Sequence, residues 1–166
     1  MKKVKKYKNG QVKRSRTYKD GVLHGPALKY NKKGIKIREK QYKSGKIDGV
    51  KKTFRNNGNL KKAELFQNGK LNGKTIWYRK DGKTVKRTIQ YQNGIRHGVQ
   101  DKFYKNSNLK SKTIFRTGSN GKEQRHGAYA SYFPDQKLHF EVLYVNGKKD
   151  GIAKKTYQNG VVRYEK

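Results

Sequence analysis

The feature that most constrains this chain is a repeat with a period of about 24 residues. One copy runs from Tyr42 to Phe66 and has glycine at positions 45, 49 and 58. Each copy opens on an aromatic residue, and the openings are separated by 24, 24, 25, 24 and 29 residues. The opening residues are Tyr18, Tyr42, Phe66, Tyr91, Phe115 and Tyr144. A repeat of this length is typical of one supersecondary unit that buries its apolar side against its neighbours.

The copies cover almost the whole chain and predict a single repeat domain over residues 1–166. A half repeat at 7–18 precedes the full copies, and a truncated copy ends the chain at 157–166. Two glycines follow each opening aromatic at nearly constant spacing. The first glycines are Gly21, Gly45, Gly69, Gly94, Gly118 and Gly147, and the second are Gly25, Gly49, Gly73, Gly98, Gly127 and Gly151. The one long interval contains an insertion near Gly118, which is predicted to be an extended hairpin tip.

Each copy is predicted to contain two short strands. Leu138, Phe140, Val142 and Tyr144 alternate along the chain, as expected of a strand with one buried face. The second strand is predicted to follow the second glycine, and glycine recurs too often for helices of normal length. The predicted fold class is therefore all-β: an elongated, single-layer antiparallel meander of β-hairpin repeats with about thirteen strands, twisted and curved.

Asn or Asp directly before Gly marks seven predicted type I′ hairpin turns, because both central residues of that turn need a positive φ. The pairs are Asn9-Gly10, Asn57-Gly58, Asn68-Gly69, Asp81-Gly82, Asn93-Gly94, Asn146-Gly147 and Asn159-Gly160. Ser107 and Gln136 stand where other copies have a third glycine, so their turns are predicted to differ. Ile35 and Ile37 are out of phase with Tyr42, which predicts a bulge there.

The alternation also predicts how side chains divide between the two faces of the sheet. Leu60 is in phase with Phe66, and positions one, three and five after the second glycine lean apolar. One face is therefore expected to be aromatic and aliphatic, and the other, which carries Lys51 and Thr53, polar to basic. The aromatic stripe is interpreted as the core of the sheet, with base stacking as the alternative. Trp77 falls on the polar face and is a candidate exposed aromatic contact.

The charge of the chain is extreme, with 44 Lys and Arg against 11 Asp and Glu and a formal net charge of +33. A field of this sign concentrates polyanions. The alternative is that the lysines only keep exposed sheet edges soluble. Without cysteine the chain has no disulfide or thiolate metal site, and it has no apolar stretch long enough to span a membrane. A non-secreted, cytoplasmic protein is expected, with a nucleoprotein or virus-like particle as a possible setting.

The unit Tyr-x-Asn-Gly-x-x-x-Gly, followed by an aromatic residue and Asn-x-Gly, resembles the MORN repeat, specifically its bacterial-type variant. The resemblance covers the chain from Tyr7 to Tyr164. It implies a non-catalytic scaffold that acts in protein association or in binding anionic phospholipid. The same variant occurs in proteins labelled as YwqK-family antitoxins, which implies binding and masking of a partner protein. The high positive charge is a departure from that family.

The residues give little support for catalysis or for a metal site. His24, His97 and His126 each precede a second glycine, but copies two strands apart lie about 10 Å from one another, so these residues are interpreted as turn residues. The carboxylates of Glu39, Glu64 and Glu141 are expected to pair with lysines on neighbouring strands. No nucleophile motif stands out. The chain is therefore expected to be no enzyme and to need no cofactor.

The candidate anion-binding residues are the cations that recur in every copy. They are Lys13, Arg14, Arg16, Lys36, Arg38, Lys40, Lys51, Lys52, Lys61, Lys62, Lys86, Arg87, Lys110, Lys112, Lys154 and Lys155. Stacked along a sheet they would form rows of positive charge that match phosphates without reading bases. The expected function is a scaffold whose basic face docks on an anionic partner, with nucleic acid as the first choice. The alternatives are an inhibitor that masks an acidic toxin and a peripheral binder of anionic membranes.

Overall fold

The computed structural model describes residues 1–165. The chain divides into two compact units, the first of residues 1–83 and the second beginning at Thr84. Unit 1 contains β1 (Lys2–Lys6), β2 (Val12–Lys19), β3 (Val22–Tyr30), β4 (Lys36–Lys43), β5 (Lys46–Ile47), β6 (Gly49–Phe54), β7 (Leu60–Gln67), β8 (Lys70–Leu71) and β9 (Gly73–Tyr78). Unit 2 contains β10 (Val85–Gln92), β11 (Ile95–Phe103), β12 (Leu109–Thr117), β13 (Glu123–Arg125), β14 (Gly127–Tyr132), β15 (Leu138–Val145), β16 (Lys148–Thr156) and β17 (Val162–Glu165).

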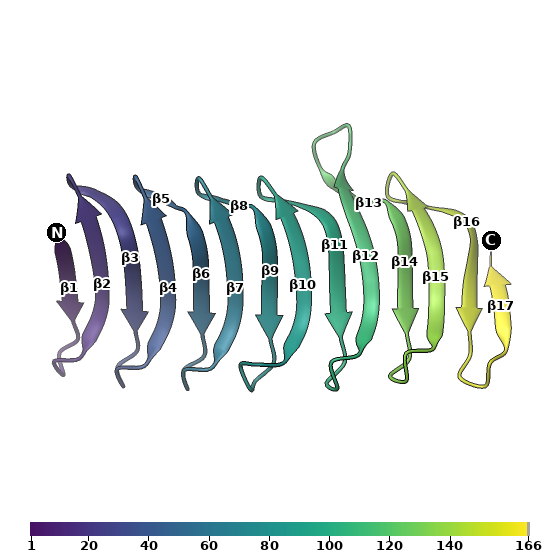
Figure 1. The fold of residues 1–166 in the computed structure, drawn as a ribbon, viewed down its shortest axis with the longest axis horizontal. Helices are drawn as coiled ribbons and strands as arrows, with labels where there is room; N and C mark the ends of the chain where they lie inside the picture. The colour runs from purple at the N-terminus through teal and green to yellow at the C-terminus, as the bar shows by residue number, and fades with distance from the viewer. Residues whose placement is uncertain (166) are drawn as a thin grey trace. The chain divides into compact units, whose positions relative to one another are not determined.

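The predicted all-β fold class and antiparallel meander are confirmed. Within each unit, strands that follow one another in sequence pair side by side in an open layer, and the described residues contain no helix (Figure 1). The described strands number 17 rather than about thirteen. The difference arises mainly at β5, β8 and β13, each separated by one residue from the strand after it. In the other copies the corresponding strands β3, β11 and β16 are continuous.

The sequence predicts that the second strand follows the second glycine. This glycine is the first residue of β6, β9 and β14, but it lies inside the continuous strands β3, β11 and β16. In the β2–β3 hairpin, Arg16 pairs with Ala27 and Tyr18 pairs with Leu23, so β3 contains two extra residues at this point. Gly25 there has a φ of +91°, which L side chains rarely adopt. On its other side Gly25 pairs with Tyr42, the opening aromatic of the next copy. The same glycine–aromatic pairing recurs in both units, so the repeat period is set by this contact.

The turns are of two kinds, and only three of the seven predicted type I′ turns have positive φ at both residues. These are at Asn68, Asn93 and Asn146, each followed by a glycine that also has positive φ. At Asn9-Gly10 only the glycine has positive φ, its N–H donates to the Tyr7 carbonyl at 3.1 Å, and the Asn9 side chain accepts from the Gln11 N–H. The remaining three predicted pairs share this pattern of φ. These longer loops suit a type I turn followed by a left-handed glycine.

The insertion after Gly118 forms the predicted hairpin tip. The Gly118 N–H donates to the Lys122 carbonyl at 2.9 Å, and β13 pairs with β12 beyond it. Figure 1 shows this loop as the longest connection of its unit. No helix follows this loop in the described chain, so the loop lacks the helix N-terminus that phosphate-binding loops use.

Ser107 and Gln136 do not change their turns, which corrects the prediction. Both adopt the left-handed conformation of the glycines they replace, with φ of 69° and 72°. Their N–H groups donate to the carbonyls of Tyr104 and Phe133 at 3.2 and 3.0 Å, as in the glycine-containing copies. The surrounding hairpin therefore imposes the conformation despite its cost for a residue with a Cβ atom.

Replacing Ser107 or Gln136 by glycine is therefore expected to stabilise unit 2. Each substitution removes a left-handed L residue and should raise the free energy of unfolding by about 1 kcal/mol, after the greater chain entropy of glycine is taken into account. Urea denaturation followed by circular dichroism measures the effect. Ser119→Gly, at an exposed residue of the hairpin tip that does not have a positive φ, is the control and should be neutral or destabilising. A loss of stability in both test variants would contradict the strain argument.

Hydrogen bonds between successive copies explain the polar residues of the turns. The Tyr7 hydroxyl donates to the Tyr30 carbonyl at 2.9 Å, and the Tyr104 hydroxyl donates to the Tyr132 carbonyl at 2.9 Å. At the opposite ends of the strands, the Asp48 carboxylate accepts from the Asn68 N–H at 2.9 Å. The column of His, Asp and Asn before the second glycine therefore includes side chains that join one turn to the next.

The division of side chains between the two faces of the sheet differs from the prediction. A one-residue bulge interrupts the alternation in each strand that carries an opening aromatic. In β7, Lys62 pairs with Thr53 but Leu60 pairs with Phe54, which leaves Lys61 as an extra residue. Leu60 and Phe66 consequently lie on opposite faces. The bulge predicted near Ile37 is thus present, but it recurs in the other hairpins of this type.

In each unit the opening aromatics share their face with cations, which we call the cation–ring face. Lys3 lies over Tyr18 at 5.2 Å, Lys51 over Phe66 at 5.4 Å, and Arg96 over Phe115 at 4.6 Å. The expected separation of rings from cations is therefore wrong. Long basic side chains cover the rings with their methylene groups and keep their charges in water.

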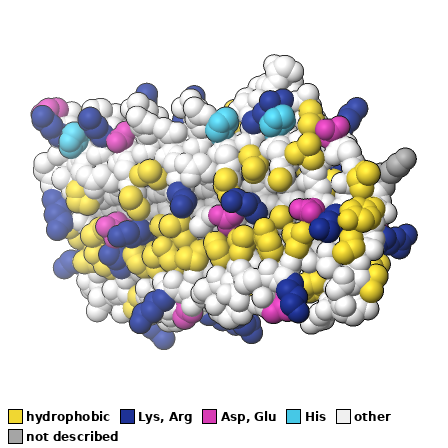
Figure 2. All heavy atoms as spheres, turned by 45° about the vertical axis from the view of Figure 1, so that its right-hand side comes forward, with side chains coloured by type: hydrophobic (Ala, Val, Ile, Leu, Met, Phe, Trp, Pro, Cys, Tyr) yellow, Lys and Arg dark blue, Asp and Glu magenta, His cyan; other side chains and the backbone are white. Residues whose placement is uncertain are grey.

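The other face of each unit, which we call the aliphatic face, carries Leu28 and Ala63 in unit 1 and Val99 and Ile114 in unit 2. Charges on it are mostly paired across strands, as in Lys154 and Glu141 at 3.9 Å. Figure 2, which brings the C-terminal strands forward, shows hydrophobic side chains gathered along this face with acidic groups beside basic ones. The aliphatic face therefore has a much smaller excess of positive charge.

Candidate anion-binding site

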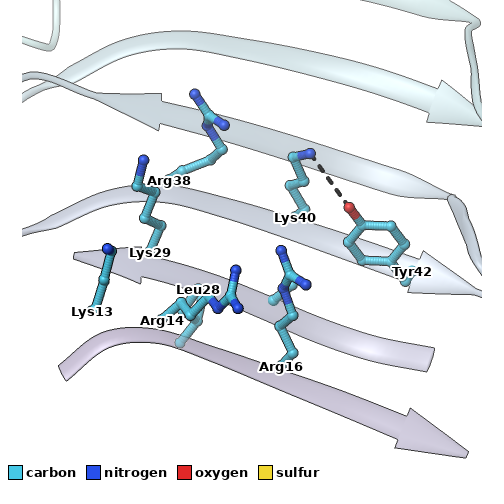
Figure 3. Close-up of a pocket in the computed structure, with 9 residues that line it drawn as sticks. Lys13, Arg14, Arg16, Leu28, Lys29, Arg38, Lys40 and Tyr42 are labelled. Carbon is cyan, nitrogen blue, oxygen red and sulfur yellow. Dashed lines mark hydrogen bonds between the residues drawn. The ribbon is translucent and has the colours of Figure 1, made fainter. Parts of the chain in front are cut away.

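Unit 1 concentrates cations on the cation–ring face because pairs of opposed residues place them on adjacent strands. Arg14 of β2 pairs with Lys29 of β3, and Lys29 pairs with Arg38 of β4. Neighbouring strands are about 4.8 Å apart, so the three backbones form a close row across the sheet. Arg16 and Lys40 flank Ala27 in the next row. Figure 3 shows these five long side chains projecting from the same side of the strands.

The small side chain of Ala27 leaves a hollow of about 230 Å³ between these cations, which we call the cationic groove. The groove is lined by Lys13, Arg14, Arg16, Ala27, Leu28, Lys29, Arg38, Lys40 and Tyr42. Ala27 itself is 9% exposed and forms part of the floor. The Lys40 ammonium donates to the Tyr42 hydroxyl at 3.3 Å (Figure 3). Six cations and no acidic residue therefore surround one hollow.

The groove cations have no acidic partners in the described part of the chain. None of the six forms an ion pair there, and the nearby carboxylate of Glu39 is paired instead with Lys36 at 2.8 Å on the aliphatic face. The hydrogen bond from Lys36 lowers the pKa of Glu39 and keeps that carboxyl ionised. Because like charges on adjacent strands repel one another, a bound anion would relieve unfavourable energy that the free protein carries.

Glu64 ends the unneutralised part of this face. Its carboxylate is 5% exposed and accepts from Lys51 and Lys62, each at 2.8 Å. Burial by itself raises the pKa of Glu64, but the hydrogen bonds from Lys51 and Lys62 outweigh it, and the pKa lies below its ordinary value of 4.5. These two predicted anion-binding lysines therefore already have an internal counter-ion.

The Glu64 cluster predicts a distinct acid sensitivity. A carboxyl whose folded pKa is depressed contributes stability above its unfolded pKa, and this contribution is lost as pH falls through the folded pKa. We expect Glu64→Gln to cost about 2 kcal/mol at pH 7, since two charge-assisted hydrogen bonds are weakened. Urea denaturation between pH 7 and pH 2 should show the wild-type advantage shrinking below about pH 4.5. An advantage that persists unchanged at pH 2 would contradict the assignment.

The predicted cations divide between the two faces. Lys13, Arg14, Arg16, Arg38 and Lys40 meet in the groove, and Arg87 and Lys155 line a second hollow in unit 2. Lys36 and Lys154 lie on the aliphatic face, where each is close to a glutamate. Lys52 and Lys112 also lie on the aliphatic face, opposite Glu39 and Asp101. Lys61 is the extra residue of the β7 bulge, Lys86 is exposed, and Lys110 lies over the Tyr104 ring at 5.2 Å.

Sequence reasoning missed several cations of the cation–ring face, including Lys29 in the groove and Arg96, Arg125 and Lys149 in unit 2. The three in unit 2 pair directly with the opening aromatics Tyr91, Phe115 and Tyr144. In unit 1 the corresponding residues are aliphatic: Leu23, Ile47 and Leu71. A comparison of the copies column by column contains this signal, because the column changes from aliphatic to cationic midway along the chain.

Trp77 lies on the cation–ring face, as its position predicts, but it is half-buried rather than freely exposed. It pairs with Lys62, whose ammonium lies over the indole ring at 4.9 Å. The same Lys62 ammonium is paired with Glu64 at 2.8 Å, so Trp77 lies beside the Glu64 cluster and not beside the groove. Trp77 is therefore part of the packing that covers the neutralised end of this face.

The described residues contain no cluster of three or more His, Asp or Glu side chains suited to a metal ion. No helix that could cross a membrane was found in the same part of the chain. The arrangement that stands out chemically is thus the pair of cation-lined hollows, one in each unit. No protein-family model matches this sequence, and no curated protein matches it either.

Proposed function

We propose that this protein is a non-catalytic, MORN-type repeat scaffold that binds nucleic acid through the cation–ring face of unit 1. The observation that carries the proposal is the cationic groove, in which six basic side chains surround one hollow and have no acidic partner among the described residues. Structural lysines that only keep a sheet soluble would be expected to pair with acids or to point outward singly. A cluster of unneutralised cations is instead the usual footprint of a phosphate-rich partner.

The geometry favours contacts to phosphates over the reading of bases. The groove cations project from a flat row of strands, and no helix in the described chain could enter the major groove of a duplex. Arg14, Arg16 and Arg38 offer guanidinium groups that bind phosphate oxygens in pairs. The net charge of +33 would add long-range attraction to this local contact. We therefore expect high affinity, steep salt dependence and little sequence preference.

The test is the salt dependence of binding to a fluorescent 20-nucleotide RNA of mixed sequence. If the six groove cations each neutralise a phosphate, affinity for this single strand should fall about 300-fold between 0.05 and 0.2 M salt. A second RNA of the same composition and scrambled sequence should bind equally well. A change of less than tenfold over this range would count against the proposal.

Two competition arms address the other expected partners. If the groove serves nucleic acid, vesicles of phosphatidylserine should be displaced by RNA at equal phosphate concentration. Preferential retention on the vesicles would support a membrane-binding role instead. Co-purification of a single acidic protein that survives both nuclease and moderate salt would support the inhibitor role and overturn the nucleic-acid proposal.

A further inference from the structure

The cation–ring face of unit 2 has a hollow of different chemistry from the groove of unit 1. Its volume is about 680 Å³, within the range of about 300–1,000 Å³ that is usual for sites that bind small ligands. Its lining includes Arg125 and Lys149, which pair with opening aromatics, and also Arg96, whose guanidinium is paired with Glu123. The other charged residues of the lining are Arg87, Lys102, Lys155 and Glu165. Aromatic rings and hydroxyl groups occupy much of the remaining lining. The hollow thus combines aromatic rings with an excess of positive charge.

Two of its rings are covered and two are available. Phe115 and Tyr144 are 8% and 9% exposed and lie beneath Arg96 and Arg125, at 4.6 and 5.1 Å. Tyr129 and Phe140 are half-buried, and the nearest cations lie only at 6.0 and 5.9 Å, the limit of a cation–π contact. Their ring centroids are 6.0 Å apart with planes inclined at 56°. These two rings therefore form an open, angled surface inside the hollow.

Small hydroxyl residues beside the two rings keep this surface accessible. Ser131 pairs with Phe140, and Ser131 in turn pairs with Ser111 across β12. In unit 1 the same row is filled by the long side chains of Arg14, Lys29 and Arg38. In unit 2 the row has Lys102 and Lys155 on the outer strands, but the two serines between them leave space above the sheet and supply short hydrogen-bonding groups. An aromatic ligand with polar edges and an attached negative charge suits this combination.

We propose that the hollow of unit 2 binds an unpaired nucleotide of a single-stranded nucleic acid. The base lies against Tyr129 and Phe140, and the adjoining phosphates contact Arg125 and Lys149. The inference rests on the proposed function and adds to it a preference for single strands. Bases of a duplex are stacked on one another and cannot reach the rings, whereas unpaired bases stack on aromatic side chains in many single-strand-binding proteins.

The decisive probe is a pair of oligonucleotides with the same backbone charge, hexathymidylate and its abasic analogue, in which every base is absent. Wild-type protein should bind hexathymidylate about tenfold more tightly, because stacking of one base is worth on the order of that factor or more. This difference should persist at high salt, since stacking does not depend on counterion release. Equal affinities for the two probes would overturn the inference while leaving the nucleic-acid function intact. Failure to bind either probe, or the longer RNA, would overturn the function itself.

Two variants of the protein test whether the base of the nucleotide stacks on Tyr129 and Phe140. Tyr129→Leu combined with Phe140→Leu keeps an apolar core and should reduce the tenfold difference to about twofold or less, with abasic binding unchanged. Tyr157→Leu, at a ring outside the hollow that is 38% exposed, is the matched control and should retain the difference. Thermal melting checks that the double variant is folded. The comparison of probes on wild-type protein stands even if that variant is unstable, and an unchanged difference in a folded double variant would contradict the site.

Discussion

We expect the affinity for nucleic acid to fall about 10³-fold at 0.1 M salt when glutamine replaces all four of Arg14, Arg16, Arg38 and Lys40. Each phosphate contact to a single strand adds about 0.7 to the slope of log affinity against log salt, so four lost contacts should reduce that slope by about 3. The four side chains line one groove and have no ion-pair partners among the described residues. Their removal therefore relieves repulsion and should leave the protein at least as stable as the wild type.

The control for this variant removes the same charge from another part of unit 1. Lys19, Lys43, Lys46 and Lys70 are exposed residues that flank the first-glycine turns. Replacing all four by glutamine should weaken binding by no more than about tenfold, through the reduced net charge alone. Fluorescence anisotropy at several salt concentrations measures both variants. If the control loses as much affinity and slope as the groove variant, binding depends on total charge and the groove has no special part in it.

Alanine at Gly82 is expected to destabilise unit 1 by about 3 kcal/mol. Gly82 has a φ of +75°, which costs an L residue about 1–2 kcal/mol. A Cβ atom there would also lie 2.8 Å from the backbone nitrogen of Leu60, and a backbone atom cannot move aside as a side-chain tip can. The clash adds the cost of overpacking, about 1–3 kcal/mol.

Gly58→Ala separates the two contributions. Gly58 occupies the corresponding turn of the preceding copy with a φ of +89°, but a Cβ atom there would meet only the Ile35 side chain at 3.4 Å. It should therefore cost about 1–2 kcal/mol, the conformational part alone. Urea denaturation compares the two variants with the wild type. Equal losses would mean that backbone conformation dominates and that the close approach of Leu60 is relieved at little cost.

The copies of the repeat also show which substitutions the fold tolerates. Ser107 and Gln136 occupy glycine positions without loss of the turn hydrogen bond, so the left-handed conformation is imposed by the hairpin and not by the residue. At four of the second glycines, Gly25, Gly49, Gly98 and Gly127, an aromatic residue on the adjacent strand pairs with the glycine. All six full copies of the repeat have glycine at this second position. The fold therefore requires glycine at the second position of the repeat, whereas at the third position glycine is favourable but can be replaced.

The sequence alone determined the repeat period, the strand content and the antiparallel connections, because these follow from local features: spaced aromatics, frequent glycine and short turns. It also determined the excess of cations, and it placed Arg14, Arg16, Arg38 and Lys40 among the candidates. Which face each residue occupies was decided only by the tertiary structure. A strand alternates with a period of two, so one extra residue moves every side chain beyond it to the other face.

The bulge at Lys61 shows the effect, since it places Leu60 and Phe66 on opposite faces although six residues separate them. Counting alternate residues along the sequence therefore grouped the opening aromatics with aliphatic residues that lie on the other face of the sheet. The register between strands, which is set by pairing across the hairpins, brings them instead beneath the cations and leaves Ala27 at the floor of the groove. The same register places Ser131 between Phe140 and Ser111 in unit 2, which leaves the ring of Phe140 beside a short side chain. Such contacts depend on residues in different copies and have no signature within any one of them.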